Sequence, residues 1–160
     1  MSVTHVDFKK NRTTKEEVDR NIKKALLDIE KNLRNFGCTK FASGEDYESG
    51  EIFIQFERLG KLINMKASPK GYAAAWLEQN PWNGRRRGSY AEHKERAIKI
   101  GNTAIYSVLR DAIKSQLVLV EIGVKRFEEV FLADIMLPSG QRIIEFCDSE
   151  NLLPAPEEGE

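Results

Sequence analysis

The sequence predicts an α+β fold in a single domain. Two long segments repeat apolar residues at helical spacing, and the segment between them alternates apolar and polar residues as a strand does. The chain has 160 residues, 41% of them apolar, with 25 positive and 25 negative side chains. A chain of this length and composition can form one globular domain without a disulfide or a metal. The zero net charge excludes histone-like, polybasic and acidic-mimic proteins as whole-chain descriptions.

The first helix is predicted between residues 13 and 36. Thr13 and Glu16 form a T-x-x-E capping box at its start, and Gly37 can adopt the positive φ that ends a helix. Apolar residues recur every three or four positions from Val18 to Phe36, so they form one stripe along the helix. We expect this stripe to cover the apolar face of the sheet that follows.

A short antiparallel meander is predicted next. Residues 51–57 alternate between apolar and polar, residues 59–61 form a turn, and residues 62–66 return as a second strand. Residues 39–42 are predicted to form a strand before this hairpin, joined to it by an acidic loop over residues 43–50. Residues 13–67 are therefore expected to be a helix plus a β-meander.

The second half is predicted to begin with a basic irregular linker over residues 68–88, which contains a short helix over 72–79. Ser89 and Glu92 form a second capping box, and apolar spacing then continues to Gly123. A helix over residues 89–122 is about 51 Å long, whereas a compact domain of this size is about 40 Å wide. The helix therefore bends near Gly101, projects from the domain, or packs in a homo-oligomer. Close packing is the usual reason for a glycine inside a helix.

Residues 89–147 are predicted to comprise the long helix followed by a short helix and a hairpin. Residues 127–133 are predicted to be helical, with Phe127, Val130 and Phe131 inward. Residues 135–137 and 143–146 are predicted strands around a turn at residues 138–140. The domain is expected to span residues 1–153, and the acidic, proline-containing tail over residues 154–160 is expected to be disordered.

Charge is distributed unevenly along the chain. Residues 85–99 carry six positive and two negative side chains, a net charge of +4. Residues 9–34 carry nine positive and five negative side chains, again +4. Residues 127–160 carry one positive and nine negative side chains, a net charge of −8.

The basic segment is typical of a surface that meets phosphates. Arginines bind phosphates with two parallel hydrogen bonds, and aromatic side chains stack on the bases of single strands. Positive charge at a helix start opposes the helix dipole, which favours a functional cause. The alternative is a solvated helix start that pairs with the acidic C-terminal segment. The predicted nucleic-acid-binding residues are Arg85, Arg86, Arg87, Arg96, Lys99, Trp82 and Tyr90.

No motif of known catalytic chemistry stands in the sequence. The segment Glu92-His93-Lys94 mimics one half of a metal-nuclease motif, but it lies in a predicted helix rather than on a strand. The adjacent Glu128 and Glu129 are interpreted as a solvated helix edge. The candidate zinc ligands are too scattered for a structural site; they are His5, Cys38, His93 and Cys147. We expect no enzyme activity, no cofactor and no metal.

The sequence also predicts a compartment. Residues 1–7 are polar and contain no secretory signal, and no apolar run approaches the length of a membrane span. The two cysteines, Cys38 and Cys147, are expected to be reduced and half-buried. A cytoplasmic protein with no membrane partner is therefore expected.

Three segments of the second half carry a resemblance. They are the long helix, closest over residues 113–123, the segment Phe127–Ala133 (FEEVFLA) and the turn Leu137–Gln141 (LPSGQ). They resemble an uncharacterised family of small phage and prophage proteins, in which an IKAKLE-x-V-x-x-G helix leads into FEEEFLA and LPDG segments. The family also has L-x-x-F-G before a hairpin, as at residues 33–37 here. Val130 and Ser139 depart from the family's acidic residues.

The resemblance covers residues 15–145 in outline and is close over residues 110–141. The family has no activity that we can name, so it implies no catalytic residues. It implies a phage or mobile-element setting, in which accessory proteins commonly handle DNA or block a host defence complex.

Two functions follow as expectations. The leading one is a non-enzymatic accessory protein that contacts nucleic acid through the basic segment. The alternative is a protein-interaction module, such as an inhibitor of a host defence complex, that uses the acidic C-terminal segment or an apolar face of the long helix. A small-ligand sponge is a third expectation. A homo-oligomer through the helix over residues 89–122 is compatible with the first two.

Overall fold

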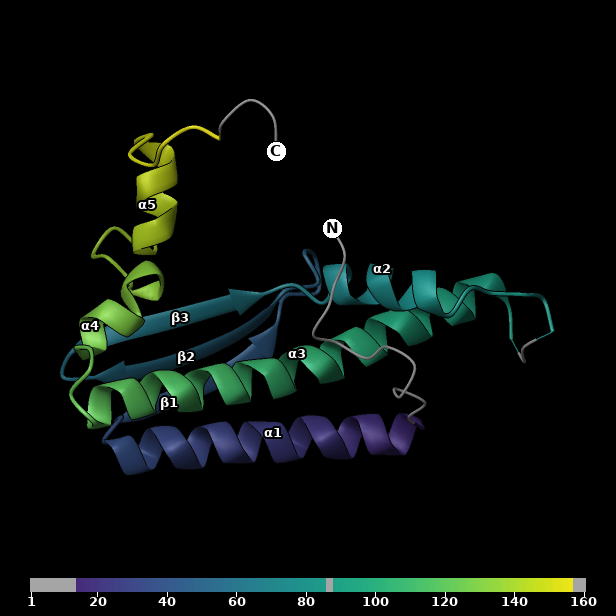
Figure 1. Ribbon diagram of the computed structural model, residues 1–160, viewed down its shortest axis with the longest axis horizontal. Helices are drawn as coiled ribbons and strands as arrows, with labels where there is room; N and C mark the ends of the chain where they lie inside the picture. Colours follow the sequence, from purple (N-terminus) through teal and green to yellow (C-terminus); the bar gives the residue numbers. More distant parts are fainter. Residues whose placement is uncertain (1–13, 86–87, 157–160) are drawn as a thin grey trace.

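The computed structural model describes residues 14–85 and 88–156 of the chain (Figure 1). Its elements follow the order helix, three strands, two helices and a C-terminal group of short helices, which confirms the predicted α+β class. In chain order they are α1 (Lys15–Phe36), β1 (Lys40–Glu45), β2 (Ile52–Arg58), β3 (Lys61–Ala67), α2 (Lys70–Gln79), α3 (Tyr90–Glu121), α4 (Phe127–Val130), the 3-10 turn η1 (Leu132–Asp134) and α5 (Ile143–Ser149).

Capping side chains fix both ends of α1. The Thr14 hydroxyl accepts a hydrogen bond from the backbone N–H of Glu17 at 3.3 Å, and the Glu17 carboxylate accepts one from the Thr14 N–H at 2.7 Å. The predicted cap at Thr13, a residue outside the described part of the chain, is wrong by one position. The T-x-x-E pattern occurs here in two overlapping registers, and Glu17 completes the box. Gly37 ends the helix at φ 101°, as predicted.

The three strands form one antiparallel sheet in the order β1-β2-β3. Leu59 and Gly60 connect β2 to β3 with φ values of 50° and 76°, the two positive angles of a tight hairpin turn that matches the twist of the strands. β1 runs on to Glu45, beyond the predicted end at residue 42, because the ladder continues until the Asp46 N–H donates to the Glu51 carbonyl at 2.8 Å. The predicted hairpin over residues 51–66, which is formed by β2 and β3, is confirmed.

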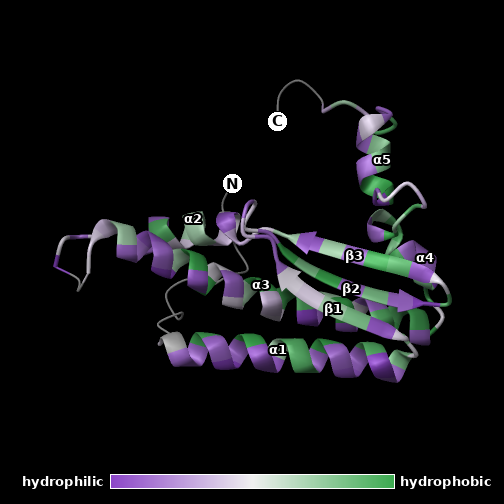
Figure 2. Ribbon diagram, turned by 180° about the vertical axis from the view of Figure 1, so that it is seen from behind, coloured by the Kyte–Doolittle hydropathy of each residue, from purple (hydrophilic) through white to green (hydrophobic). Residues whose placement is uncertain are grey.

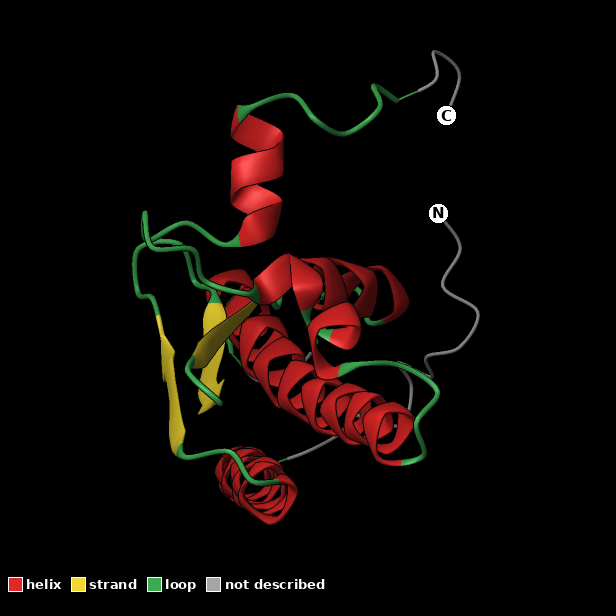
Figure 3. Ribbon diagram, turned by 90° about the vertical axis from the view of Figure 1, so that its left-hand side faces the viewer, coloured by secondary structure: helices red, strands yellow, loops and turns green. Residues whose placement is uncertain are grey.

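One face of the sheet and two helices enclose the main core. α1 and α3 lie on the same side of the sheet (Figure 3), and α1 packs mainly along α3 and meets the sheet at β1. The expectation that α1 alone covers the sheet is therefore corrected, because α3 is also apolar on the side that faces the strands. Hydrophobic and hydrophilic residues alternate along α1 (Figure 2), as in a helix with one buried face. The core includes Ala25, Ile29, Leu33, Ile52, Ile54, Phe56, Tyr106 and Ile113.

α3 is one uninterrupted helix of 32 residues, about 48 Å long. It does not break at Gly101; instead α2 packs over its first half. A Cβ atom at Gly101 would lie 2.8 Å from the Pro69 carbonyl oxygen and 3.5 Å from the Ala73 Cβ. The glycine thus permits α2 and α3 to approach closely. A second, smaller core of Ala73, Trp76, Ala97 and Ile100 fills this contact.

The C-terminal part differs from the prediction in two ways. Residues 127–133 form the single turn α4 and the 3-10 turn η1 rather than one helix, with Phe127 and Phe131 buried and Val130 half-buried. The predicted hairpin over residues 135–146 is wrong. Its turn closes a single bridge between Met136 and Arg142, while Ile135 pairs with β3.

The residues predicted as the hairpin's second strand begin α5 instead. The Glu145 carboxylate accepts a hydrogen bond from the Arg142 backbone N–H at 2.9 Å, which starts a helix at Ile143 and prevents further strand pairing. α5 stands apart from the sheet and the long helices (Figures 1 and 3). Cys147 on α5 and Cys38 after α1 are half-buried free thiols.

Candidate nucleic-acid interface

The loop between α2 and α3 forms one end of the elongated molecule (Figure 1) and carries an exposed aromatic pair. The Trp82 side chain is 40% exposed and the Tyr90 side chain 53% exposed. Their ring centroids are 5.9 Å apart, with an interplanar angle of 62°, an edge-to-face contact. Lys94 lies one helical turn after Tyr90, and its Nζ stands 4.7 Å from the Tyr90 ring centroid. We call Trp82, Arg85, Tyr90 and Lys94 the tip.

Local backbone chemistry shapes the loop that presents the tip. The Asn83 side-chain oxygen accepts a hydrogen bond from the Arg85 N–H at 3.1 Å, and Gly84 follows the bend at φ 70°. Arg85 is exposed, whereas Arg86 and Arg87 lie outside the described residues. Ser89 caps α3 by accepting from the Glu92 N–H at 3.2 Å, as predicted. The described part of the loop thus holds one exposed arginine, two residues after Asn83 and five before Tyr90 in the sequence.

A buried histidine anchors the tip to the body of the molecule. His93 is 7% exposed, and its Nε2 lies 2.7 Å from the Asn80 carbonyl oxygen at the end of α2. Because a carbonyl only accepts, Nε2 is the donor and carries a proton. The Trp76 ring packs on His93 with 5.2 Å between centroids. His93 therefore joins α2 to α3 through its contacts with Asn80 and Trp76.

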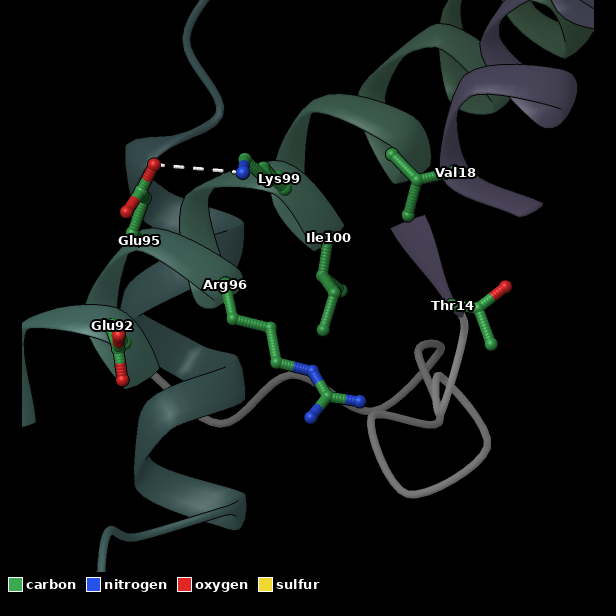
Figure 4. Close-up of a pocket in the computed structure, with 7 residues that line it drawn as sticks. All are labelled: Thr14, Val18, Glu92, Glu95, Arg96, Lys99 and Ile100. Carbon is green, nitrogen blue, oxygen red and sulfur yellow. Dashed lines mark ion pairs between the residues drawn. The ribbon is translucent and has the colours of Figure 1, made fainter. Parts of the chain in front are cut away.

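The other two predicted basic residues line a separate pocket between α3 and the start of α1 (Figure 4). Arg96 extends its guanidinium into this space, whereas Lys99 pairs with Glu95, on the preceding turn of α3, at 3.5 Å. Among the described residues Arg96 forms no ion pair. The pocket has a volume of about 440 Å³, and its lining residues are Thr14, Val18, Glu92, Glu95, Arg96, Lys99 and Ile100.

The predicted site is thus divided over two sides of α3. Nine positions separate Tyr90 from Lys99, about two and a half turns of a helix, so the two side chains point in opposite directions. The structure brings Trp82 and Tyr90 into contact at the tip, with Arg85 exposed on the same loop, and it places Arg96 and Lys99 in the lining of the pocket. Sequence reasoning missed Lys94 as the cation over Tyr90; the i, i+4 spacing is the signal that identifies it.

The adjacent acidic pair at α4 is engaged in structural contacts. The side-chain hydrogen bond from Lys61 lowers the pKa of Glu128 below its ordinary value. The hydrogen bond from the Arg126 backbone N–H likewise lowers the pKa of Glu129. Both carboxylates are held ionised at neutral pH, which is the opposite of what a general acid requires.

Over residues 14–85 and 88–156, His, Cys, Asp and Glu side chains nowhere gather in groups of three that could hold a metal ion. Among the helices described, none combines the length and the apolar character that a membrane crossing requires. Comparison of the chain with protein-family models, curated proteins and solved structures finds no match.

Proposed function

We propose that this protein is a non-enzymatic accessory protein, of the phage or prophage type that the resemblance indicates, and that it contacts single-stranded nucleic acid through the tip. The observation that supports this proposal is the exposed Trp82–Tyr90 pair with Lys94 over the Tyr90 ring and with Arg85 exposed on the same loop. Stacking of a base on an exposed aromatic side chain contributes about 1–3 kcal/mol and works with any base. The adjacent cations supply phosphate contacts.

The basic segment supplies further cations. Arg86 and Arg87 follow Arg85 in the sequence, and Arg96, which forms no ion pair with a described residue, extends into the pocket on another side of α3. Lys99 is already paired with Glu95, so it contributes less than Arg96. A strand that stacks on the tip and continues along α3 therefore meets Arg96 before Lys99.

Fluorescence anisotropy with a labelled oligothymidylate and with a duplex, titrated with salt, tests the proposal. We expect the single strand to bind more tightly than the duplex, and Trp82→Ala with Tyr90→Ala to weaken binding at least tenfold. Arg85→Ala with Lys94→Ala should lower the slope of log K against log [salt] by about 1.4, since each phosphate contact on a single strand contributes about 0.7.

A charge-matched control separates the tip from net charge. Lys23→Ala with Lys24→Ala removes two exposed positive charges from α1, and we expect it to change the affinity far less than the tip variant does. The triple substitution Arg85/Arg86/Arg87→Ala must also lose affinity. If it binds as the unmodified chain does, or if no oligonucleotide binds at low salt, the proposal is wrong.

The second candidate function is a protein-interaction module, such as an inhibitor of a host defence complex. The observation that favours it is the α5 arm, residues 143–153, in which no described side chain is buried. Phe146 is 38%, Leu152 61% and Leu153 51% exposed. Two ion pairs connect the base of the arm to the body: Arg142 with Asp134 at 2.9 Å and Lys66 with Glu145 at 3.0 Å.

This second function would be supported by a protein that still co-purifies with the chain after nuclease treatment. The double substitution Phe146→Ser with Leu152→Ser should abolish that co-purification. Because these substitutions leave the tip unchanged, nucleic-acid binding in the same variant tests the first function independently.

A further inference from the structure

α3 buries opposite faces in its two halves. In the first half α2 covers the side that includes Ala97 and Gly101. In the second half the main core covers the other side, which includes Ile113 and Leu117. The row that α2 covers therefore continues beyond α2 with no element over it in the described structure. The row's exposed or half-exposed residues are Val108, Ala112, Ser115, Leu119 and Ile122.

This uncovered face is largely apolar. Val108 is 54% exposed and Ile122 66% exposed, and Val118 beside them is 42% exposed. The row repeats at steps of three and four, which is the spacing that packs one helix against another. From Val108 to Ile122 it is about 21 Å long.

Two of the charges that flank the row, Lys114 and Glu121, are placed so that they would pair with each other across an antiparallel copy of the helix. A strip of three residues at positions i, i+4 and i+7 lies beside the row. Along the strip the side chains are positive, apolar and negative: Lys114, Val118 and Glu121. All three are exposed, and Lys114 and Glu121 form no ion pair with any described residue. When such a strip meets its own reverse, each positive end faces a negative end and the apolar centres meet.

We infer that α3 is the contact surface for a second copy of this chain, packed antiparallel about a two-fold axis near Val118. Lys114 of each copy then pairs with Glu121 of the other, and Ser115, Leu119 and Ile122 fill the seam. A two-fold contact of this kind uses the same patch on both chains and closes at the dimer. The dimer stands independently of the proposed nucleic-acid contact, since the tip lies at the other end of α3.

The fold leaves room for this arrangement. With the axis near Val118, Gly101 of the second copy lies roughly 20 Å beyond the end of α3, so α2 of that copy clears the contact. After Gly123 the chain turns back toward the core, where Phe127 and Phe131 pack on Phe56 with ring centroids 6.5 and 5.2 Å away. Neither segment covers the strip.

Sedimentation equilibrium of the full chain without nucleic acid, over a concentration series, tests the inference. The mass should rise with concentration from one chain to two. Lys114→Glu and Glu121→Lys should each raise the dimer Kd about tenfold, because each turns two attractive pairs into repulsive ones. The double variant Lys114→Glu/Glu121→Lys should restore dimerisation. Lys23→Glu on α1 changes the net charge equally and should leave the Kd unchanged.

Mixing provides a second readout. The two single variants, each weakened alone, should form a heterodimer when combined, because both cross pairs are then opposite in charge. Val118→Asp should abolish the dimer, while circular dichroism confirms that the exposed substitution leaves the fold intact. A monomer at all concentrations overturns the inference. So does a dimer that the single substitutions leave unchanged, or a double variant that stays monomeric.

Discussion

Gly101→Ala should destabilise this protein, although the same change in most helix interiors is stabilising by about 1 kcal/mol. The added Cβ would lie 2.8 Å from the Pro69 carbonyl oxygen and 3.3 Å from the Pro69 Cβ. The oxygen cannot retreat freely, because it accepts the first hydrogen bond of α2, from the Ala73 N–H at 2.9 Å. Overpacking against fixed atoms costs roughly 1–3 kcal/mol, so we expect a net loss of about 1 kcal/mol after the gain in helix propensity.

Gly71→Ala is the matched control for this prediction. Gly71 also lies in a helix, α2, but a Cβ there would meet no atom within 4 Å. It should therefore be stabilising, by up to about 1 kcal/mol. Urea unfolding followed by circular dichroism measures both variants. If Gly101→Ala stabilises the protein as much as Gly71→Ala does, the close contact between Gly101 and the Pro69 carbonyl oxygen is contradicted, and the reasoning is refuted.

Two further predictions concern pH. Burial raises the pKa of Tyr106 to about 12, with a contribution from the charge of Glu45. As the pH rises, the tyrosine hydroxyl therefore loses its proton in the unfolded chain before it does so in the folded chain. The free energy of unfolding should fall between pH 10 and pH 12, and it should fall less in Tyr106→Phe. A hydrogen bond from the Arg142 backbone N–H, with one from the Lys66 side chain, lowers the pKa of Glu145 to about 2. Its contribution to stability should be complete above about pH 4.5 and disappear as the pH falls to about 2, so Glu145→Gln and the unmodified chain should converge there in acid unfolding curves. If the free energies of unfolding of the unmodified chain and of a variant run parallel across the pH range, the pKa shift of the substituted residue is contradicted.

Helices with strong periodicity and capping residues were predictable from the sequence. The stripe from Val18 to Phe36 needs only one buried face, and Gly37 supplies the positive φ that ends it. The β2–β3 hairpin likewise follows from alternation and a two-residue turn. These signals are local, so a single sequence carries them in full.

The C-terminal part could not be predicted in the same way. Residues 143–146 are short and apolar, and such a run suits a strand or a helix equally. Glu145 decided the outcome, by capping at Arg142 and pairing with Lys66 on a distant strand. That contact joins residues far apart in the sequence, so no local pattern reports it.

The candidate site shows the same limit. The sequence grouped Tyr90 with Arg96 and Lys99 because they lie within ten residues of each other. Because of the helical repeat, Lys99 points away from Tyr90, and both Arg96 and Lys99 line the pocket beside the start of α1. The edge-to-face contact between Trp82 and Tyr90 joins the loop to α3 and was not predicted from the sequence. It depends on how the loop returns to α3 after Asn80, whose carbonyl accepts the hydrogen bond from His93.

Quenching of Trp82 fluorescence by an oligothymidylate tests the central claim most directly. The chain has two tryptophans, and Trp76 is 4% exposed, so Trp76→Phe leaves Trp82 as the sole reporter. Stacking at the tip predicts saturable quenching that follows the anisotropy curve and weakens as salt rises. Binding by anisotropy without any change in Trp82 emission would contradict the account and place the contact elsewhere on the protein.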